Sequence, residues 1–238
     1  MRKRRGCVLL LIVLVGQSVV GCSTPNPWVR VVYTPDGVLG VEGPAAGPFK
    51  TKAELAETAC KLMIGQPGAS AEHGQRGVEY CALYYYSKQD EAYFLSFFSD
   101  VRAIESGGFK NCKVPRVIYD PARQDAIIVG PAHPHPHNPV FSPQDLGAGR
   151  GTRAGLGTGE TPVGVSKFFD NATGKIWERE LLLFWGYKER RECYAYSYNY
   201  STRVVSALRN GKWVAIGIAE GQYGSLRMYE GQSWFPSK

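Results

Sequence analysis

A His-Pro alternation near the middle of the chain constrains its backbone more than any other feature. Residues 133–137 read His-Pro-His-Pro-His and contain three of the four histidines. A residue that precedes proline is pushed toward extended conformations, so Pro134 and Pro136 predict an extended backbone at His133 and His135. In an extended segment the side chains of residues i and i+2 point the same way. The two imidazoles are therefore expected to reach a single metal ion.

A serine and an aspartate follow this run at a spacing that suits a zinc hydrolase. Ser142 and Asp145 form a Ser-x-x-Asp motif. Two neutral imidazoles and one carboxylate make a zinc site that keeps its fourth position open, and a nearby hydroxyl can stabilise an oxyanion. The motif also suits a helix start, with Ser142 as N-cap, Pro143 at the first helical position and the acid in the first turn. Closely spaced glycines from residue 147 onward would keep such a helix short.

The order His-x-His, spacer and Ser-x-x-Asp resembles the JAMM motif of the JAB/MPN metallopeptidase superfamily. The resemblance implies that His133, His135 and Asp145 bind zinc, that Ser142 supports the oxyanion and that an upstream glutamate handles the proton. The spacer of six residues between the second histidine and the serine is shorter than is usual in the family. A proline stands between the two histidines, where Ser, Thr or Asn is common. His137 is either a loop residue or an alternative ligand.

Glu79 is the best candidate for the upstream glutamate. Residues 78–86 are rich in aromatic and β-favouring side chains between two turn-like segments, so they read as a strand. Alternation places Glu79 on the face of Cys81, Leu83 and Tyr85. Apolar neighbours of this kind raise the pKa of a carboxyl group toward neutrality, and a general base needs such a pKa. In the JAB/MPN superfamily the catalytic glutamate likewise stands near the start of an early strand.

The alternative for Glu79 is a solvated charge at a strand end. Glu72, Glu91 and Glu105 are weaker candidates because each lies in an apparent loop or turn. A Glu79 within water-bridging reach of the histidines favours an enzyme, whereas a remote Glu79 favours a protein without catalytic activity.

The N-terminus has the three parts of a lipoprotein signal. Residues 2–5 are basic, residues 8–15 are apolar, and Val19-Val20-Gly21-Cys22 fits a lipobox. We therefore expect residues 1–21 to be removed and Cys22 to be acylated, which anchors the protein to a membrane through lipid alone. A plain secretory signal cut elsewhere is the alternative, but it leaves Cys22 unexplained. Ser23, in place of an aspartate, favours the outer membrane of a bacterial cell envelope.

The net charge of +7 does not indicate a nucleic-acid partner. Residues 2–5 supply four of the 28 Lys and Arg residues, and the remaining 24 face 21 acidic residues. That balance is typical of an ordinary surface, without the basic stripe of a nucleic-acid-binding protein.

Four cysteines remain after the signal and the lipidated residue are set aside: Cys60, Cys81, Cys112 and Cys193. In an exported chain they favour two disulfides, with three pairings open. None has the Cys-x-x-Cys spacing of a metal site. A nucleophilic cysteine is the other reading.

The residues after the signal predict an α+β fold with a mainly antiparallel sheet and few helices. We expect a lipidated tether with a β segment at residues 22–50, a JAB-like core at 51–170 and a C-terminal β extension at 171–238, which either continues the sheet or forms an accessory unit. Within the core, Thr51-Lys52-Ala53-Glu54 is a capping box that begins a helix ending at Gly65. Further strands are expected at residues 93–98, 114–119 and 126–129.

The C-terminal region carries hairpin signals. Residues 170–174 and 209–212 resemble turns, the second with a strong Asn-Gly signal. Tyr194, Tyr196, Tyr198 and Tyr200 alternate along one strand face. This face is either an exposed platform for glycan or peptide, or simply packs the sheet.

These features favour a membrane-tethered, zinc-dependent hydrolase of peptide or isopeptide bonds in protein or peptide substrates. Two alternatives stay open: a non-catalytic envelope lipoprotein with a degenerate JAB fold, and a His-rich metal-binding module.

Overall fold

The structure is a computed structural model, and it describes residues 25–102, 112–143, 145–146, 167–170, 174–220 and 225–236. The predicted signal, the lipobox with Cys22 and the candidate Glu105 lie outside these residues. Within them, no helix is both long and apolar enough to cross a bilayer.

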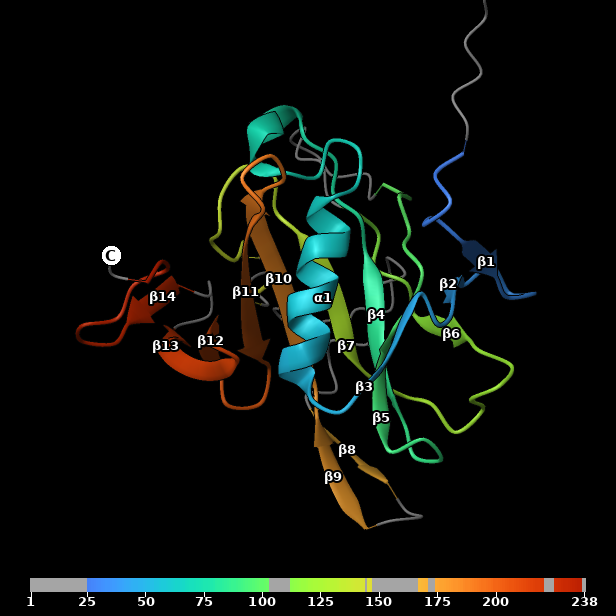
Figure 1. Ribbon diagram of the computed structural model, residues 1–238. Coiled ribbons are helices and arrows are strands. Elements are labelled where there is room, and N and C mark those ends of the chain that lie inside the picture. Colours follow the sequence, from blue (N-terminus) through green and yellow to red (C-terminus); the bar gives the residue numbers. More distant parts are fainter. Residues whose placement is uncertain are drawn as a thin grey trace, which may run out of the picture.

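A nine-stranded sheet forms the centre of the molecule (Figure 1). Its strand order is β14-β13-β12-β11-β10-β7-β4-β5-β3, and every neighbouring pair is antiparallel except β7 and β10. The bounds are β3 (Ala46–Phe49), β4 (Ala82–Ser87), β5 (Ala92–Leu95), β7 (Ile127–Pro134), β10 (Glu180–Tyr187), β11 (Glu192–Asn199), β12 (Val204–Arg209), β13 (Lys212–Glu220) and β14 (Ser225–Met228). The predicted α+β fold with a mainly antiparallel sheet is confirmed. Strands from both sides of the expected boundary at residue 170 belong to this one sheet, in which β7 lies next to β10.

Two small sheets flank the large one. Strands β1 (Val31–Tyr33), β2 (Leu39–Glu42) and β6 (Val117–Tyr119) form a three-stranded sheet on the right of Figure 1. Strands β8 (Lys167–Asp170) and β9 (Lys175–Glu178) form a ribbon that projects at the bottom.

Helix α1 (Lys52–Ile64) covers one face of the large sheet (Figure 1). The Thr51 side chain accepts a hydrogen bond from the backbone N–H of Glu54, as the capping motif predicts, and the helix ends at Gly65. The Glu54 carboxylate accepts from the N–H of Lys50 instead of that of Thr51. A short 3₁₀ segment, η1 (Ala71–Arg76), follows.

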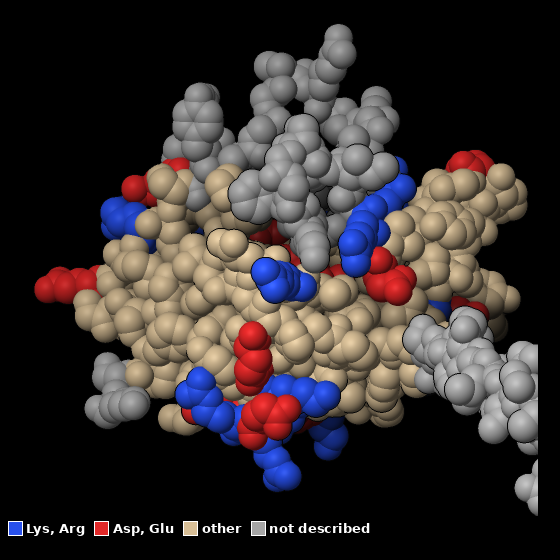
Figure 2. Space-filling model, turned by 90° about the horizontal axis from the view of Figure 1, so that it is seen from above, with Lys and Arg blue, Asp and Glu red and all other residues tan. Residues whose placement is uncertain are grey.

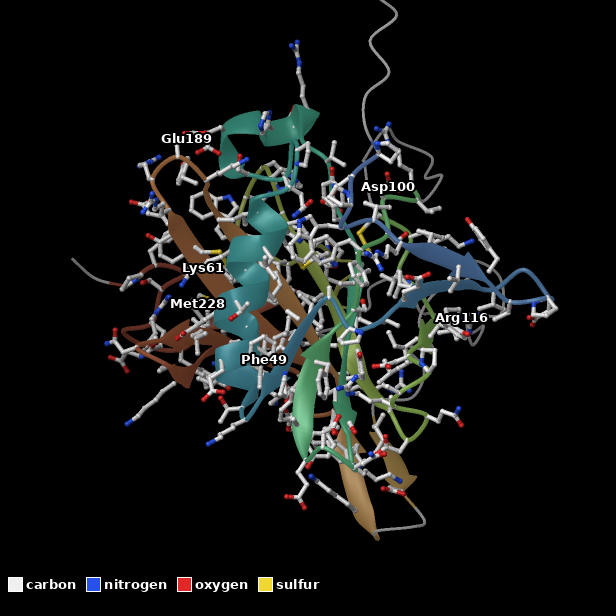
Figure 3. The ribbon with its side chains drawn as sticks, turned by 45° about the vertical axis from the view of Figure 1, so that its right-hand side comes forward. Phe49, Lys61, Asp100, Arg116, Glu189 and Met228 are labelled. Atoms are coloured by element: carbon white, nitrogen blue, oxygen red, sulfur yellow. A yellow bond between two sulfur atoms is a disulfide. The ribbon has the colours of Figure 1, made fainter. Side chains whose placement is uncertain are left out.

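The sheet is apolar on both faces. Toward α1, buried residues from the helix meet Ala82, Tyr84, Ala132, Leu182 and Phe184 of β4, β7 and β10, and Figure 3 shows side chains filling this space. The other face carries a second cluster: Phe141, Leu146, Leu181, Leu183, Tyr196, Tyr198, Val205, Ala207, Ile216 and Ala219. Because strand side chains alternate, His133 lies on this second face, opposite to its neighbour Ala132.

The described residues contain two disulfides, as expected for an exported chain. Cys60 of α1 bonds to Cys193 of β11, and Cys81 bonds to Cys112. The first disulfide therefore fastens the helix to the sheet.

Four strands differ from their expected bounds. The strands expected at residues 93–98 and 114–119 are shorter, as β5 (Ala92–Leu95) and β6 (Val117–Tyr119). The strand expected at residues 78–86 begins only at Ala82, so Glu79 lies in the segment that leads into β4. The strand expected at residues 126–129 continues to Pro134 because β10 supplies a parallel partner, which pairs Leu183 with His133. Pro134 ends the strand, where its missing N–H removes little pairing.

The C-terminal hairpins follow the predicted turns. Asn210 and Gly211 connect β12 to β13 with φ angles of 50° and 73°, as a two-residue turn of type I′ requires. Tyr196 and Tyr198 are buried in the second cluster, and Tyr194 and Tyr200 pack against it. The tyrosine face thus packs the sheet.

On the exposed part of the face seen in Figure 2, lysine and arginine side chains lie among aspartate and glutamate side chains. No large patch of one sign stands out there.

Candidate metal centre

His133, His135 and Asp145 form a group whose ligand atoms lie within 4.8 Å of one another. Nε2 of His133 is 3.3 Å from Oδ1 of Asp145, and Nε2 of His135 is 3.4 Å from Oδ2. Both histidines are buried. The structure thus brings together the three residues that the sequence proposes as ligands, and this group could hold a metal ion.

The end of β7 positions the two imidazoles. His133 pairs with Leu183 of β10, and the N–H of His135 donates to the carbonyl of Phe184, so the extended backbone continues through the second histidine. The rings lie parallel, with centroids 5.0 Å apart and planes inclined by 14°. Their common direction is the one that Pro134 and Pro136 predict.

Two hydrogen bonds hold the Asp145 side chain in place. Its Oδ2 atom accepts from the backbone N–H of Ser142 at 2.7 Å and from the Ser142 hydroxyl at 2.8 Å. The N–H of Asp145 donates to the Ser142 hydroxyl oxygen at 3.2 Å. This is the reciprocal arrangement of a capping box. The Ser-x-x-Asp motif therefore serves both predicted roles. The hydrogen bonds that would cap a helix also turn the Asp145 carboxylate toward the histidines.

The surroundings favour an ionised carboxylate at this point. Burial alone would raise the pKa of Asp145, but the adjacent imidazoles of His133 and His135 outweigh it and hold that pKa well below its usual range. The Asp145 side chain is only 11% exposed, so a cationic partner would stabilise its charge.

The orientation of the His135 ring also suits metal binding. Its Nδ1 atom lies 3.1 Å from the carbonyl oxygen of Val140. A carbonyl only accepts hydrogen bonds, so Nδ1 carries a hydrogen and Nε2 is the nitrogen available to a metal ion. The His133 Nε2 atom is buried and has no hydrogen-bond partner among the described residues. A metal ion between the two Nε2 atoms and the Asp145 carboxylate would give each of them a partner.

His137 lies outside this group. Its ring stacks on that of His135, with centroids 5.5 Å apart, and its side chain is exposed. The geometry places it as a neighbour of a ligand.

Glu79 lies in the segment before β4. The register of β4 with β7 pairs Ala82 with Ala132, and continuing it places Cys81 opposite His133 and Glu79 opposite His135. Two contacts follow this continuation: a side chain on Gly77 would meet Pro136, and the Cys81 sulfur lies within 4.8 Å of the His133 imidazole. Opposed residues of an antiparallel pair point to the same face, so we infer that Glu79, which is buried, faces the histidines.

The weaker glutamate candidates are engaged elsewhere. Glu72 accepts backbone hydrogen bonds from Lys188 and Glu189 in the turn between β10 and β11. Glu91 is exposed and occupies a turn with φ of 50°.

Two features next to the site are absent from the sequence-based expectation. The Cys81–Cys112 disulfide lies beside His133. The parallel register pairs Leu183 of β10 with His133. Continuing it by two residues places Trp185 opposite His135. Alternation along residues 78–86 already predicts that Cys81 shares the face of Glu79, but the partner strand can only be seen in the fold.

Comparison of the chain with protein-family models, curated proteins and solved structures gives no match.

Proposed function

We propose that this protein is a zinc-dependent hydrolase of peptide or isopeptide bonds, of the JAMM type. The observation that carries the proposal is the group of His133, His135 and Asp145, in which both histidines are buried. Glu79, which we infer to face the histidines, is the candidate base. Two histidines and one carboxylate are the ligand set of an open, catalytic zinc site.

Zinc bound there would supply a Lewis acid and make water nucleophilic at neutral pH. The protein's own residues supply the rest. Glu79 would take a proton from the attacking water and return it to the leaving amine. The Val140 carbonyl keeps the Nε2 lone pair of His135 directed at the site. The Ser142 pair of hydrogen bonds keeps Asp145 aimed at the same point.

Ser142 has a second proposed role, which is to stabilise the oxyanion of the reaction. Its hydroxyl hydrogen is donated to Asp145, so this role requires the hydroxyl to exchange that bond for one to the oxyanion. The short spacer between His135 and Ser142 fits a serine whose main role is to orient the Asp145 carboxylate.

The location that fits this function is the cell envelope. We propose that lipid on Cys22 tethers the protein to the envelope, with the outer membrane favoured by Ser23. Substrates would then be envelope peptides or proteins.

A second candidate function is metal binding without chemistry. The stacking of His137 on His135 favours it, since an exposed third imidazole next to two ligands suits capture of metal from solution. In this case Glu79 would have no catalytic role.

One experiment separates the candidates. The purified protein would be loaded with zinc and incubated with fluorogenic peptides and with peptides joined through a lysine side chain. Zinc-dependent cleavage that Glu79→Gln abolishes and the matched Glu72→Gln variant retains supports the hydrolase. Stoichiometric zinc with no cleavage in wild type supports the binding module.

A further inference from the structure

Two sulfur atoms lie against the metal centre. Sγ of Cys81, Sγ of Cys112 and a ring nitrogen of His133 lie within 4.8 Å of one another, and all three residues are buried. The two cysteines form a disulfide. His133 is therefore shared between two groups of three metal-ligating residues, one with sulfur and one with oxygen.

Backbone pairing fixes the cysteines at this place. Cys81 and Ser99 exchange two backbone hydrogen bonds, of 2.9 and 2.7 Å. Figure 3 shows sulfur atoms close to Asp100, the next residue. Cys112 is paired with Arg102 by an isolated bridge. Each cysteine thus has a backbone partner of its own, in addition to the bond between the two sulfur atoms.

The other disulfide gives a contrast. Cys60–Cys193 joins α1 to β11 on the opposite face of the sheet. Neither of these cysteines belongs to a group of three metal-ligating residues in the described parts of the chain. The position beside a histidine is thus specific to Cys81–Cys112.

We propose that the dithiol form of the protein binds zinc through Cys81, Cys112 and His133, and that the disulfide form releases His133 to the site with His135 and Asp145. Two thiolates and an imidazole are strong zinc ligands. The Cα atoms of the two cysteines are 5.6 Å apart. Side-chain rotation at that separation can place both sulfurs about 2.3 Å from one ion.

The redox step is a thiol–disulfide exchange. A dithiol reductant donates two electrons and two protons to the Cys81–Cys112 bond, which becomes two thiols while the reductant becomes a disulfide. Zinc then displaces the two thiol protons into solvent.

The two zinc modes exclude each other. A neutral imidazole has one nitrogen with a free lone pair, and its other nitrogen carries hydrogen. When His133 ligates the thiolate-bound ion, the oxygen-containing site keeps only His135 and Asp145. Oxidation would therefore switch His133 from a thiolate-rich site to an open one. This inference shares His133 with the proposed hydrolase but does not depend on hydrolysis.

Cobalt(II) provides the test, because thiolate ligands give it a strong near-ultraviolet charge-transfer band that nitrogen and oxygen ligands do not. Wild type and the Cys81→Ser/Cys112→Ser variant would be reduced with dithiothreitol, freed of it by gel filtration under argon and titrated with cobalt(II). Thiol titration verifies reduction. The variant keeps the Cys60–Cys193 pair, so it controls for cobalt bound by those two thiols. We expect about one thiolate-bound cobalt per reduced wild-type chain, none in the variant and none in oxidised wild type.

A second variant checks the histidine. His133→Ala in the reduced protein should weaken cobalt binding at least about tenfold, as expected for loss of one ligand of three. Circular dichroism would establish that each reduced protein stays folded, and reduced Cys60→Ser/Cys193→Ser provides the same site without the other thiols. A reduced wild type that has all its thiols free and lacks the band would overturn the proposal. Equal bands in wild type and Cys81→Ser/Cys112→Ser would also overturn it.

Discussion

The hydroxyl of Ser142 donates a 2.8 Å hydrogen bond to Oδ2 of Asp145, the carboxylate whose two oxygens face His133 and His135. The serine thus orients a candidate metal ligand through the hydrogen bonds that usually begin a helix. Because ligand position controls metal affinity, this contact connects a local turn to the chemistry of the site.

The candidate metal ligands are the first target for mutation. His133→Ala and Asp145→Ala should each lower zinc affinity about 100-fold or more, because a three-residue site loses a third of its protein ligands. His137→Ala is the matched control and should change affinity little, since this ring only stacks on His135. Elemental analysis and competition with a chromogenic chelator would measure both effects. Equal zinc content in wild type and His133→Ala/His135→Ala would contradict the site.

Ser142→Ala should lower zinc affinity about 10- to 100-fold through the loss of Asp145 orientation. The backbone bond from Ser142 to Asp145 would remain, so the loss should be smaller than for Asp145→Ala. If zinc binding is unchanged while turnover falls, the serine acts on the oxyanion instead. Zinc affinity and turnover measured on the same preparation separate the two roles.

Glu79→Gln should retain zinc and the fold but lower turnover about 100-fold or more, because the amide is nearly isosteric and cannot accept the proton. Glu72→Gln is the matched control, since its carboxylate is bound to the turn between β10 and β11. Unchanged hydrolysis in Glu79→Gln would remove this residue from the mechanism.

Cys22→Ser should move the protein from the membrane fraction to the soluble fraction, because acyl chains would supply its anchor. The substitution should leave the thermal unfolding midpoint of the folded part unchanged. Persistence in the membrane fraction after a high-salt wash would exclude the lipid tether as the anchor.

Gly130→Ala should destabilise the protein by about 3 kcal/mol, because a Cβ atom there would lie 1.7 Å from the Glu180 carbonyl oxygen. Gly130 lies on β7 between β4 and β10, so the alignment of the metal ligands should also suffer. Gly37→Ala is the comparison: it has open space but a φ of +80°, and should cost only about 1 kcal/mol. Chemical denaturation would measure both, and equal losses would show that the close approach of β7 and β10 does not matter.

Some parts of the fold follow from neighbouring residues in the sequence. The helix that begins after Thr51 and the turn at Asn210 and Gly211 form as predicted, because a cap and a left-handed turn depend on only a few adjacent residues. The common direction of His133 and His135 is local in the same way, since each is followed by a proline.

Other parts depend on partners distant in the sequence. The extension of β7 to Pro134 requires β10, about fifty residues later, and the inferred position of Glu79 requires the register of β4 with β7. The pairing of Cys81 with Cys112 has the same origin. Alternation along a strand determines which side chains share a face, so the sequence by itself determined the faces of these residues. Which strands lie side by side is decided by the packing of the whole core, and only the tertiary structure therefore decided that a disulfide and two histidines meet at one end of the sheet.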